Sequence, residues 1–277
     1  MQRAFAEVDV FTAVHYRGNP LAVVLDGTGL STDEMQRFAN WTNFSETTFL
    51  LPSTDPTADY SVRIFTGTSE LPFAGHPTIG SCHAWLAQGR VPRTDGRIVQ
   101  ECGVGLVEIR RDGEGRLAFA APPLLREGPL DEATIQLAAD ALGIDRAAVV
   151  DAAWIDNGPG WLGVLLSSAD EVLALTCGTT DLKIGVVGPK ATGAAHAYEV
   201  RAFFPGAGAT FEDPVTGSLN ASAAQWLIGN GTFTAPYVVS QGTAMGRAGQ
   251  VFITTDDGGQ VWVGGDAVTC VAGTVEL

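Results

Sequence analysis

The feature that most constrains the fold of this chain is an internal repeat. The segment YSVRIF, at 60–65, returns as YEVRAF 138 residues later, and HPTIGS, at 76–81, is answered by DPVTGS 137 residues later. Two matches at nearly the same spacing indicate two related halves. Each copy is typical of a strand, a Gly/Pro loop and an Ala-rich helix that ends at glycine.

Outside the repeat, most of the sequence predicts strands joined by turns. The Asp-Gly pair at 112–113 separates two β-rich runs, which indicates a hairpin. Surface helices are predicted at about 31–40 and 131–142, after a Ser/Thr/Asp start and after a proline respectively. The Pro-Pro pair at 122–123 suits a linker. The predicted fold is therefore α+β, with each half a curved, mostly β unit around one apolar helix.

Composition argues against several classes of partner. A net charge of −15 over 277 residues opposes binding to a phosphate backbone, so no nucleic acid is expected. The sequence contains neither a signal peptide pattern nor an apolar run long enough to span a membrane, and a cytoplasmic location is expected. The four cysteines are scattered without metal-ligand spacing, so we expect reduced thiols, mostly buried, and no metal site; they are Cys82, Cys102, Cys177 and Cys270.

The two repeated Gly/Pro loops predict helix starts that bind an anion. Asp213 could cap a helix that has Pro214 at its first position, and His76 takes the cap position in the other copy. Gly75 leaves room for a ligand to approach the backbone. If the halves face each other, both helix N-termini would converge on a carboxylate, and Ser218 would add a hydroxyl donor. The alternative is that the acid and the imidazole serve only as caps, and that the serine only stabilises its helix.

Glu46 is the candidate for proton transfer. It enters an apolar strand in the segment NFSETTFLLP instead of a charged patch. A carboxylate at such a place would be partly desolvated, a condition that suits general acid/base work. The residues alone leave open a glutamate on an edge strand that points to water.

Several segments together resemble the signature blocks of the PhzF family. They are GNPLAVVL (18–25), NFSETTFLL (43–51), RIFTGTSELPFAGHPTIGSCHAWL (63–86), EDPVTGSLNASAAQWL (212–227) and the C-terminal stretch from QGTAMGR onwards. The blocks occur in order through almost the whole chain, which makes the resemblance specific.

The resemblance implies a diaminopimelate-epimerase-like fold with two pseudo-symmetric, β-barrel-like domains, each around a central helix. One domain would span 1–121, completed by the strand at 266–277, and the other 122–265, with an active site between them. Members of this family are commonly homodimers that need no metal or organic cofactor. The phenazine-pathway members isomerise a dihydro-hydroxyanthranilate.

The resemblance also implies roles for individual residues. Glu46 corresponds to the acid/base, and His76 and Asp213 to polar residues that flank a small anionic substrate. Further substrate contacts are expected from six residues: Gly75, Gly217, Ser218, Asn157, Gly158 and Asn19. One carboxylate that removes and redelivers a proton fits an allylic or keto-enol isomerisation.

Two other functions stay open at this point. Epimerases of the same fold use a cysteine in each half, and neither repeated helix start here has a thiol, which disfavours a thiol-based racemase. Cys102, in ECGVG, lies in a predicted hairpin outside the repeat and suits a structural role. A non-catalytic metabolite-binding protein would keep the cleft without needing an acid/base. The run GPGWLG at 158–163 matches a dinucleotide pattern but lacks the strand and helix that an NAD site requires.

Overall fold

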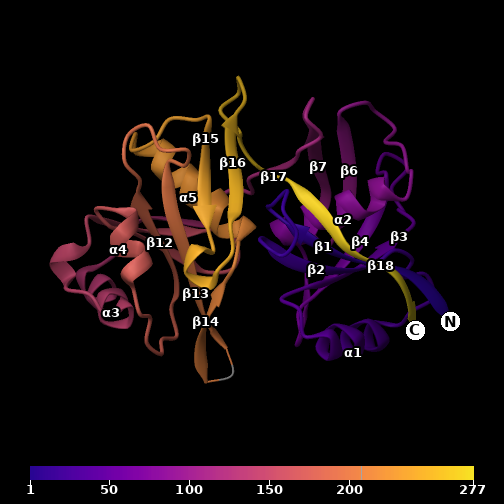
Figure 1. Ribbon diagram of the computed structural model, residues 1–277, viewed down its shortest axis with the longest axis horizontal. Coiled ribbons are helices and arrows are strands. Elements are labelled where there is room, and N and C mark those ends of the chain that lie inside the picture. The colour runs from indigo at the N-terminus through magenta and orange to yellow at the C-terminus, as the bar shows by residue number, and fades with distance from the viewer. Residues whose placement is uncertain (207) are drawn as a thin grey trace. The chain divides into compact units, whose positions relative to one another are not determined.

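The structure is a computed structural model that describes residues 1–206 and 208–277. The chain divides into two compact units (Figure 1). Unit 1 comprises Met1–Ala120 and Gly264–Leu277, and unit 2 comprises Ala121–Val263. Each unit combines a curved, mostly antiparallel sheet with a few helices, which confirms the α+β class predicted from the sequence.

Unit 1 contains one continuous sheet that includes both ends of the chain. The order β18-β1-β2-β3-β4-β6-β7-β8 follows from the strand pairs. The last strand pairs with the first, and the two termini lie side by side (Figure 1). Its strands are β1 (Gln2–Val10), β2 (Asn19–Val24), β3 (Thr47–Leu51), β4 (Tyr60–Phe65), β5 (Glu70–Leu71), β6 (Arg97–Cys102), β7 (Gly105–Arg111), β8 (Leu117–Ala120) and β18 (Ala267–Glu276).

Helix α2 (Gly75–Ala87) fills the centre of unit 1. It contacts six strands of the sheet, from β1 to β18, and nine of its thirteen residues are buried. A helix that is apolar on all sides needs this surrounding because every face must leave water. Gly75 permits a close approach to the sheet, since a Cβ atom there would overlap the Phe119 ring of β8. The start of α2 is therefore held directly against the strands.

The sheet of unit 2 repeats the strand order of unit 1, from β9 and β10 to β16. The strands are β9 (Arg126–Pro129), β10 (Asp151–Asp156), β11 (Trp161–Leu165), β12 (Lys183–Pro189), β13 (Tyr198–Gly206), β14 (Ala209–Asp213), β15 (Tyr237–Gln241) and β16 (Gly249–Thr255), and β17 (Val261–Gly265) returns the chain to unit 1. The helices are α3 (Glu132–Leu142), α4 (Ala169–Ala174) and α5 (Gly217–Gly229), with short 3₁₀ turns η1 (Arg146–Ala148) and η2 (Thr243–Met245).

The strand pairings show that the repeat extends to the topology. From β1 to β7 the successive pairs are antiparallel, parallel, antiparallel, parallel and antiparallel. The pairs from β10 to β16 follow the same sequence. The repeated segments YSVRIF and YEVRAF form β4 and the first part of β13. Helix α5 holds the place of α2, since each lies between a short hairpin strand and the next sheet strand.

The two surface helices begin where the sequence predicts. Helix α1 (Thr32–Thr42) starts with a capping box, in which Ser31 and Glu34 satisfy each other's backbone N–H groups. Helix α3 starts after Asp131, whose carboxylate accepts a hydrogen bond from the Thr134 amide. Both caps satisfy amides that the first helical turn leaves without partners.

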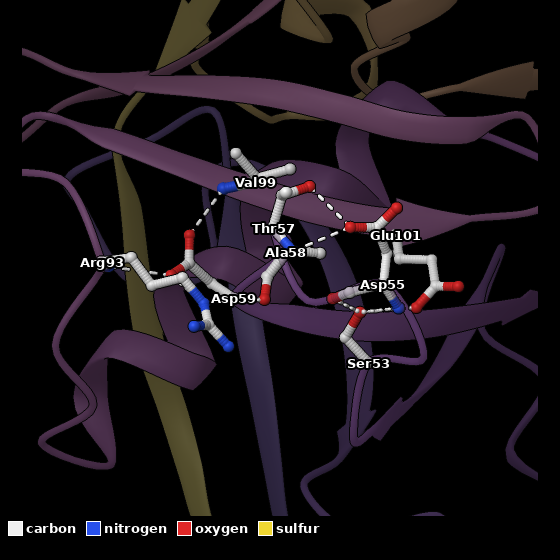
Figure 2. Close-up of polar contacts among 8 residues, drawn as sticks. All are labelled: Ser53, Asp55, Thr57, Ala58, Asp59, Arg93, Val99 and Glu101. Carbon is white, nitrogen blue, oxygen red and sulfur yellow. Dashed lines mark hydrogen bonds and ion pairs between the residues drawn. The ribbon is translucent and has the colours of Figure 1, made fainter.

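Two carboxylates tie the segment between β3 and β4 to its neighbours (Figure 2). Asp59 accepts hydrogen bonds from the amides of Arg93 and Val99. Glu101, at the end of β6, accepts hydrogen bonds from the Ser53 hydroxyl and the Thr54 amide. These hydrogen bonds lower the pKa of the Glu101 carboxyl to about 2 because they favour its charged form.

Candidate active site

The side chains of Glu46 and His76 are in contact inside unit 1. Glu46 immediately precedes β3, and His76 is the second residue of α2. Their contact joins the Glu46 Oε2 and His76 Nδ1 atoms at 3.0 Å, with the side chains 19% and 4% exposed respectively. The strand and the central helix thus bring together two residues that are 30 positions apart in the sequence.

The second ring nitrogen of His76 is buried and has no hydrogen-bond partner. Since a carboxylate only accepts hydrogen bonds, Glu46 favours a proton on Nδ1 of the imidazole. In the neutral ring Nε2 then carries a lone pair, and in the charged ring it carries a second proton. The imidazole can therefore position the Glu46 carboxylate for proton transfer through Nδ1, while Nε2 remains as a further polar atom.

The prediction that His76 caps its helix is wrong. Helix α2 begins at Gly75, its N-cap is Ala74, and no side chain satisfies the first amides. A histidine at the cap would have to offer a ring nitrogen to the helix backbone, whereas the Nδ1 atom of His76 faces Glu46.

The predicted helix start at Asp213 and Pro214 is also wrong. Asp213 is the last residue of β14, where it pairs with Ala202 of β13, and α5 begins only at Gly217 after the N-cap Thr216. The Asp213 carboxylate instead accepts a hydrogen bond from the Thr216 hydroxyl at 2.5 Å. Ladder pairing with β13 therefore keeps the acid in an extended strand.

Helix α5 begins later in the repeat than α2 does. Gly217 is the first residue of α5 as Gly75 is of α2, and Ser218 is the second residue as His76 is. Contacts with the strands instead match Ser218 with Gly80. A Cβ atom at Gly80 would meet Val10 and Leu21, and Ser218 bonds to Asn157 and Trp161, which occupy the same two places in the sheet of unit 2. The N-cap residues are an alanine in unit 1 and Thr216 in unit 2, so neither helix start carries a thiol.

Ser218 is held by two side chains of unit 2. The Trp161 indole Nε1 donates to the Ser218 hydroxyl at 3.0 Å, and the Asn157 amide nitrogen donates to the Ser218 carbonyl at 2.9 Å. The structure therefore brings together two of the predicted site residues, Asn157 and Ser218. The Asn157 Oδ1 atom is buried and has no hydrogen-bond partner.

Gly158 lies in the turn between β10 and β11. The Asp156 carboxylate accepts hydrogen bonds from the backbone amides of Gly158 and Gly160, so the Gly158 amide already has a partner. Because β10 and β11 are antiparallel, the GPGWLG run connects two strands of a hairpin and not a strand to a helix. Asn19 lies at the start of β2, where it is fully buried and pairs with Val10 of β1.

A fully buried glutamine anchors the start of α5. The Gln241 side-chain oxygen accepts from the Thr216 amide at 2.9 Å and from the Asn220 side chain at 2.8 Å. Its nitrogen donates to the Asp213 carbonyl and the Thr216 hydroxyl. Asp213 and the first turn of α5 are thereby fixed to β15.

Unit 1 also has a buried glutamine that bonds to the first turn of its central helix, at a different strand position. Gln100, on β6, donates to the Thr78 hydroxyl of α2 and accepts from the Tyr60 hydroxyl. Sequence reasoning singled out neither glutamine. Each strand carries other polar residues, RIVQEC in β6 and YVVSQ in β15, so the sequence does not distinguish either glutamine.

Strand register identifies which residues of the two units are equivalent. Phe65 of β4 faces Thr47 of β3. Phe203, which repeats that phenylalanine in β13, faces Ile184 of β12. Thr47 and Ile184 therefore occupy the same place in their sheets.

The same register assigns Glu46 a counterpart in unit 2. Glu46 is the residue before Thr47, and Lys183 is the residue before Ile184. Lys183 is half-buried, and its ammonium donates to the Pro159 carbonyl at 2.6 Å. Sequence reasoning missed this lysine because nothing in DLKIGVV distinguishes it from a surface cation.

None of the four cysteines is among the residues that contact Glu46, His76 or Ser218 in the bonds described above. All four are free; Cys82 is buried, and the other three are half-buried. Cys102 lies at the end of β6 and pairs with Gly105 across the β6–β7 hairpin, as predicted. Burial raises the pKa of the Cys82 thiol to about 12 and that of the Cys102 thiol above its usual value.

The described residues, 1–206 and 208–277, contain neither a membrane-spanning helix nor a cluster of metal ligands. No helix there is long and apolar enough to cross a membrane. Nor do three His, Cys, Asp or Glu side chains in those ranges come together as metal ligands.

Comparison with known proteins identifies the family. The family model described as phenazine biosynthesis-like protein matches residues 8–273. The chain belongs to the PhzF family. It is 31% identical to trans-2,3-dihydro-3-hydroxyanthranilate isomerase of Pseudomonas fluorescens, over 98% of both chains. It is also 38% identical to Antisense-enhancing sequence 1 of Schizosaccharomyces pombe, again over 98% of both.

Solved structures agree on the fold. The Bacillus anthracis phenazine biosynthesis protein of the PhzF family superimposes with a TM-score of 0.84 over 100% of both chains, at 22% identity. A hydroxyproline epimerase from Agrobacterium vitis gives a TM-score of 0.58 at 14% identity, covering 99% of this chain and 92% of the epimerase. The enzyme class that the PhzF relatives indicate is that of an isomerase.

Proposed function

We propose that this PhzF-family isomerase moves a proton on a small anionic cyclic acid, with Glu46 as the general acid/base. The observation that carries the proposal is the contact between the Glu46 carboxylate and the His76 imidazole at 3.0 Å, made by two side chains that are largely out of water. A carboxylate held in this way is positioned by its partner and is less hydrated than one on the surface, which suits proton transfer.

The proposed reaction is an allylic or keto-enol isomerisation. Glu46 removes a proton from one carbon of the ring, and the electron pair of that C–H bond moves into the adjacent π system. The carboxylic acid so formed returns the proton to another carbon on the same face. This reaction needs no oxidant or reductant, and we propose no metal or organic cofactor for it.

The remaining predicted residues are proposed as substrate contacts. Asp213 supplies a second carboxyl, and the Ser218 hydroxyl binds an oxygen of the substrate. Further contacts come from four residues, which are Gly75, Gly217, Asn157 and Asn19, together with Gly158 through atoms other than its amide nitrogen. The proposal keeps the domain limits 1–121 with 266–277 and 122–265, the substrate between the domains, a homodimer and a cytoplasmic location, all of which remain predictions from the sequence.

Deuterium exchange tests the role of Glu46. The protein is incubated in D₂O with trans-2,3-dihydro-3-hydroxyanthranilate, the compound in the name of the Pseudomonas relative, and with other cyclic enol acids. NMR then follows deuterium at ring carbons. Glu46→Gln should slow exchange by about 100-fold or more, the usual effect of losing a general acid/base.

A matched variant controls for the loss of one charge. Glu108→Gln removes a half-buried glutamate of β7 that pairs with Arg97, and it should exchange at the wild-type rate. Exchange that persists in Glu46→Gln contradicts the assigned role. If the wild-type protein binds these acids without exchange, it is a binding protein. Loss of optical rotation from an amino or imino acid would instead identify a racemase.

A further inference from the structure

Lys183 stands in unit 2 where Glu46 stands in unit 1, and its side chain shares a face with Trp161. These two residues are Cα partners in the parallel pair of β11 and β12. Side chains of such partners point to the same side of the sheet. Trp161 reaches the Ser218 hydroxyl of α5 from that side. The lysine therefore rises from the sheet face that carries the start of the central helix.

Trp161 fixes the polarity of the Ser218 hydroxyl. An indole N–H can only donate, so the serine oxygen must accept from it. The hydroxyl proton of Ser218 then points elsewhere and is available to an acceptor. Trp161 is itself only 4% exposed, which leaves its N–H dependent on the serine oxygen. The tryptophan thus converts a group that could accept or donate into a donor.

Lys183 supplies positive charge in a strongly acidic chain. It is one of only two lysines among 277 residues that carry a net charge of −15. Its ammonium has three N–H donors, and one is used by the Pro159 carbonyl at 2.6 Å. An ammonium on the same face as a hydroxyl donor is suited to a carboxylate, which accepts several hydrogen bonds.

We propose that unit 2 carries a carboxylate-binding half-site in which Lys183 supplies the charge and Trp161 orients the Ser218 hydroxyl as a donor. This inference rests on the proposed function for the class of its ligand, a small cyclic acid. It adds Lys183 as a binding residue and Trp161 as a positioning residue. The unit that carries Glu46 then performs the proton transfer, and unit 2 holds the anion.

A pair of probes that differ only in charge tests the lysine. Anthranilate carries a carboxylate and anthranilamide a neutral amide on the same aminophenyl ring, and calorimetry gives the dissociation constant of each. The wild-type protein should prefer anthranilate by about tenfold, a common size for one charge-assisted contact. Lys183→Met should abolish the preference, whereas Lys183→Arg, which keeps the charge and the donor to Pro159, should retain most of it.

The control for net charge is Arg146→Met. Arg146 lies in η1, where it pairs with the exposed Glu132, and its loss should leave the preference intact. Equal binding of the two probes by the wild-type protein overturns the proposal, as does a preference that survives in Lys183→Met. Because these measurements need no turnover, a failure of the proposed isomerisation would appear separately, as absent deuterium exchange.

A double-mutant cycle tests the positioning role of Trp161. Trp161→Phe keeps most of the ring but removes the N–H, and it should weaken anthranilate binding three- to tenfold. In a Ser218→Ala background the same change should cost nothing further, because the hydroxyl that it orients is gone. Equal weakening in both backgrounds would show that the indole acts only through packing and would overturn this part of the proposal.

Discussion

Replacement of Gln241 by methionine should be among the most destabilising single changes in unit 2. Gln241 is fully buried and makes four hydrogen bonds, to the Thr216 amide, the Thr216 hydroxyl, the Asn220 side chain and the Asp213 carbonyl. Methionine has nearly the same volume but offers none of them. At a net value of about 1 kcal/mol for each bond, the free energy of unfolding should fall by roughly 4 kcal/mol.

Urea denaturation followed by circular dichroism measures this loss. The control is Gln250→Met, since Gln250 is exposed on β16 and its loss should change the unfolding free energy by less than about 0.5 kcal/mol. A loss below about 1 kcal/mol in Gln241→Met would refute the claim that the glutamine anchors the start of α5.

A second variant checks the reason for the magnitude. Much of the cost should come from buried polar groups that lose a partner, among them the Asn220 side-chain nitrogen, which would keep only its bond to the Thr216 carbonyl. In Gln241→Met combined with Asn220→Leu, that side-chain amide is also removed. The double variant should therefore be more stable than the sum of the single losses predicts, by about 1 kcal/mol. Strict additivity would mean that the two side chains do not depend on each other.

Two further predictions concern packing and pH. Gly185→Ala in β12 should lower the free energy of unfolding by about 1–3 kcal/mol in urea denaturation, because the new Cβ atom would overlap the Leu219 side chain of α5. Glu101 should titrate near pH 2 by NMR, and Ser53→Ala should raise that midpoint because it removes a bond to the charged form. Since the folded pKa lies below the unfolded value of about 4.3, the stabilisation is complete above that value and is lost as the pH falls towards 2.

The sequence predicts the scaffold well where its signals are local. The YSVRIF and YEVRAF segments form matching strands, and the caps of α1 and α3 lie at the predicted residues. Each of these features depends on side chains a few positions apart. Only the family resemblance placed Glu46 and His76 in one site. No short-range sequence pattern connects a residue before β3 with one at the start of α2.

The helix starts were misplaced because the two hairpins before them differ in length. In unit 1 the strand before α2 is only Glu70–Leu71, whereas in unit 2 β14 runs through Ala209–Asp213. The longer ladder keeps Asp213 extended and delays the helix to Gly217. HPTIGS lies wholly within α2, whereas DPVTGS runs from the last residue of β14 to the second residue of α5. Only strand pairing, which the sequence does not display, separates them.

The same pairing argues for a division of chemistry between duplicated units. A two-base racemase needs an acid and a base on opposite faces of one carbon. Here Glu46 is matched by a lysine at position 183. An ammonium group suits the binding of an anion. The duplication has thus preserved the sheet and the central helix but not the group at this position, which is consistent with the single acid/base that we propose.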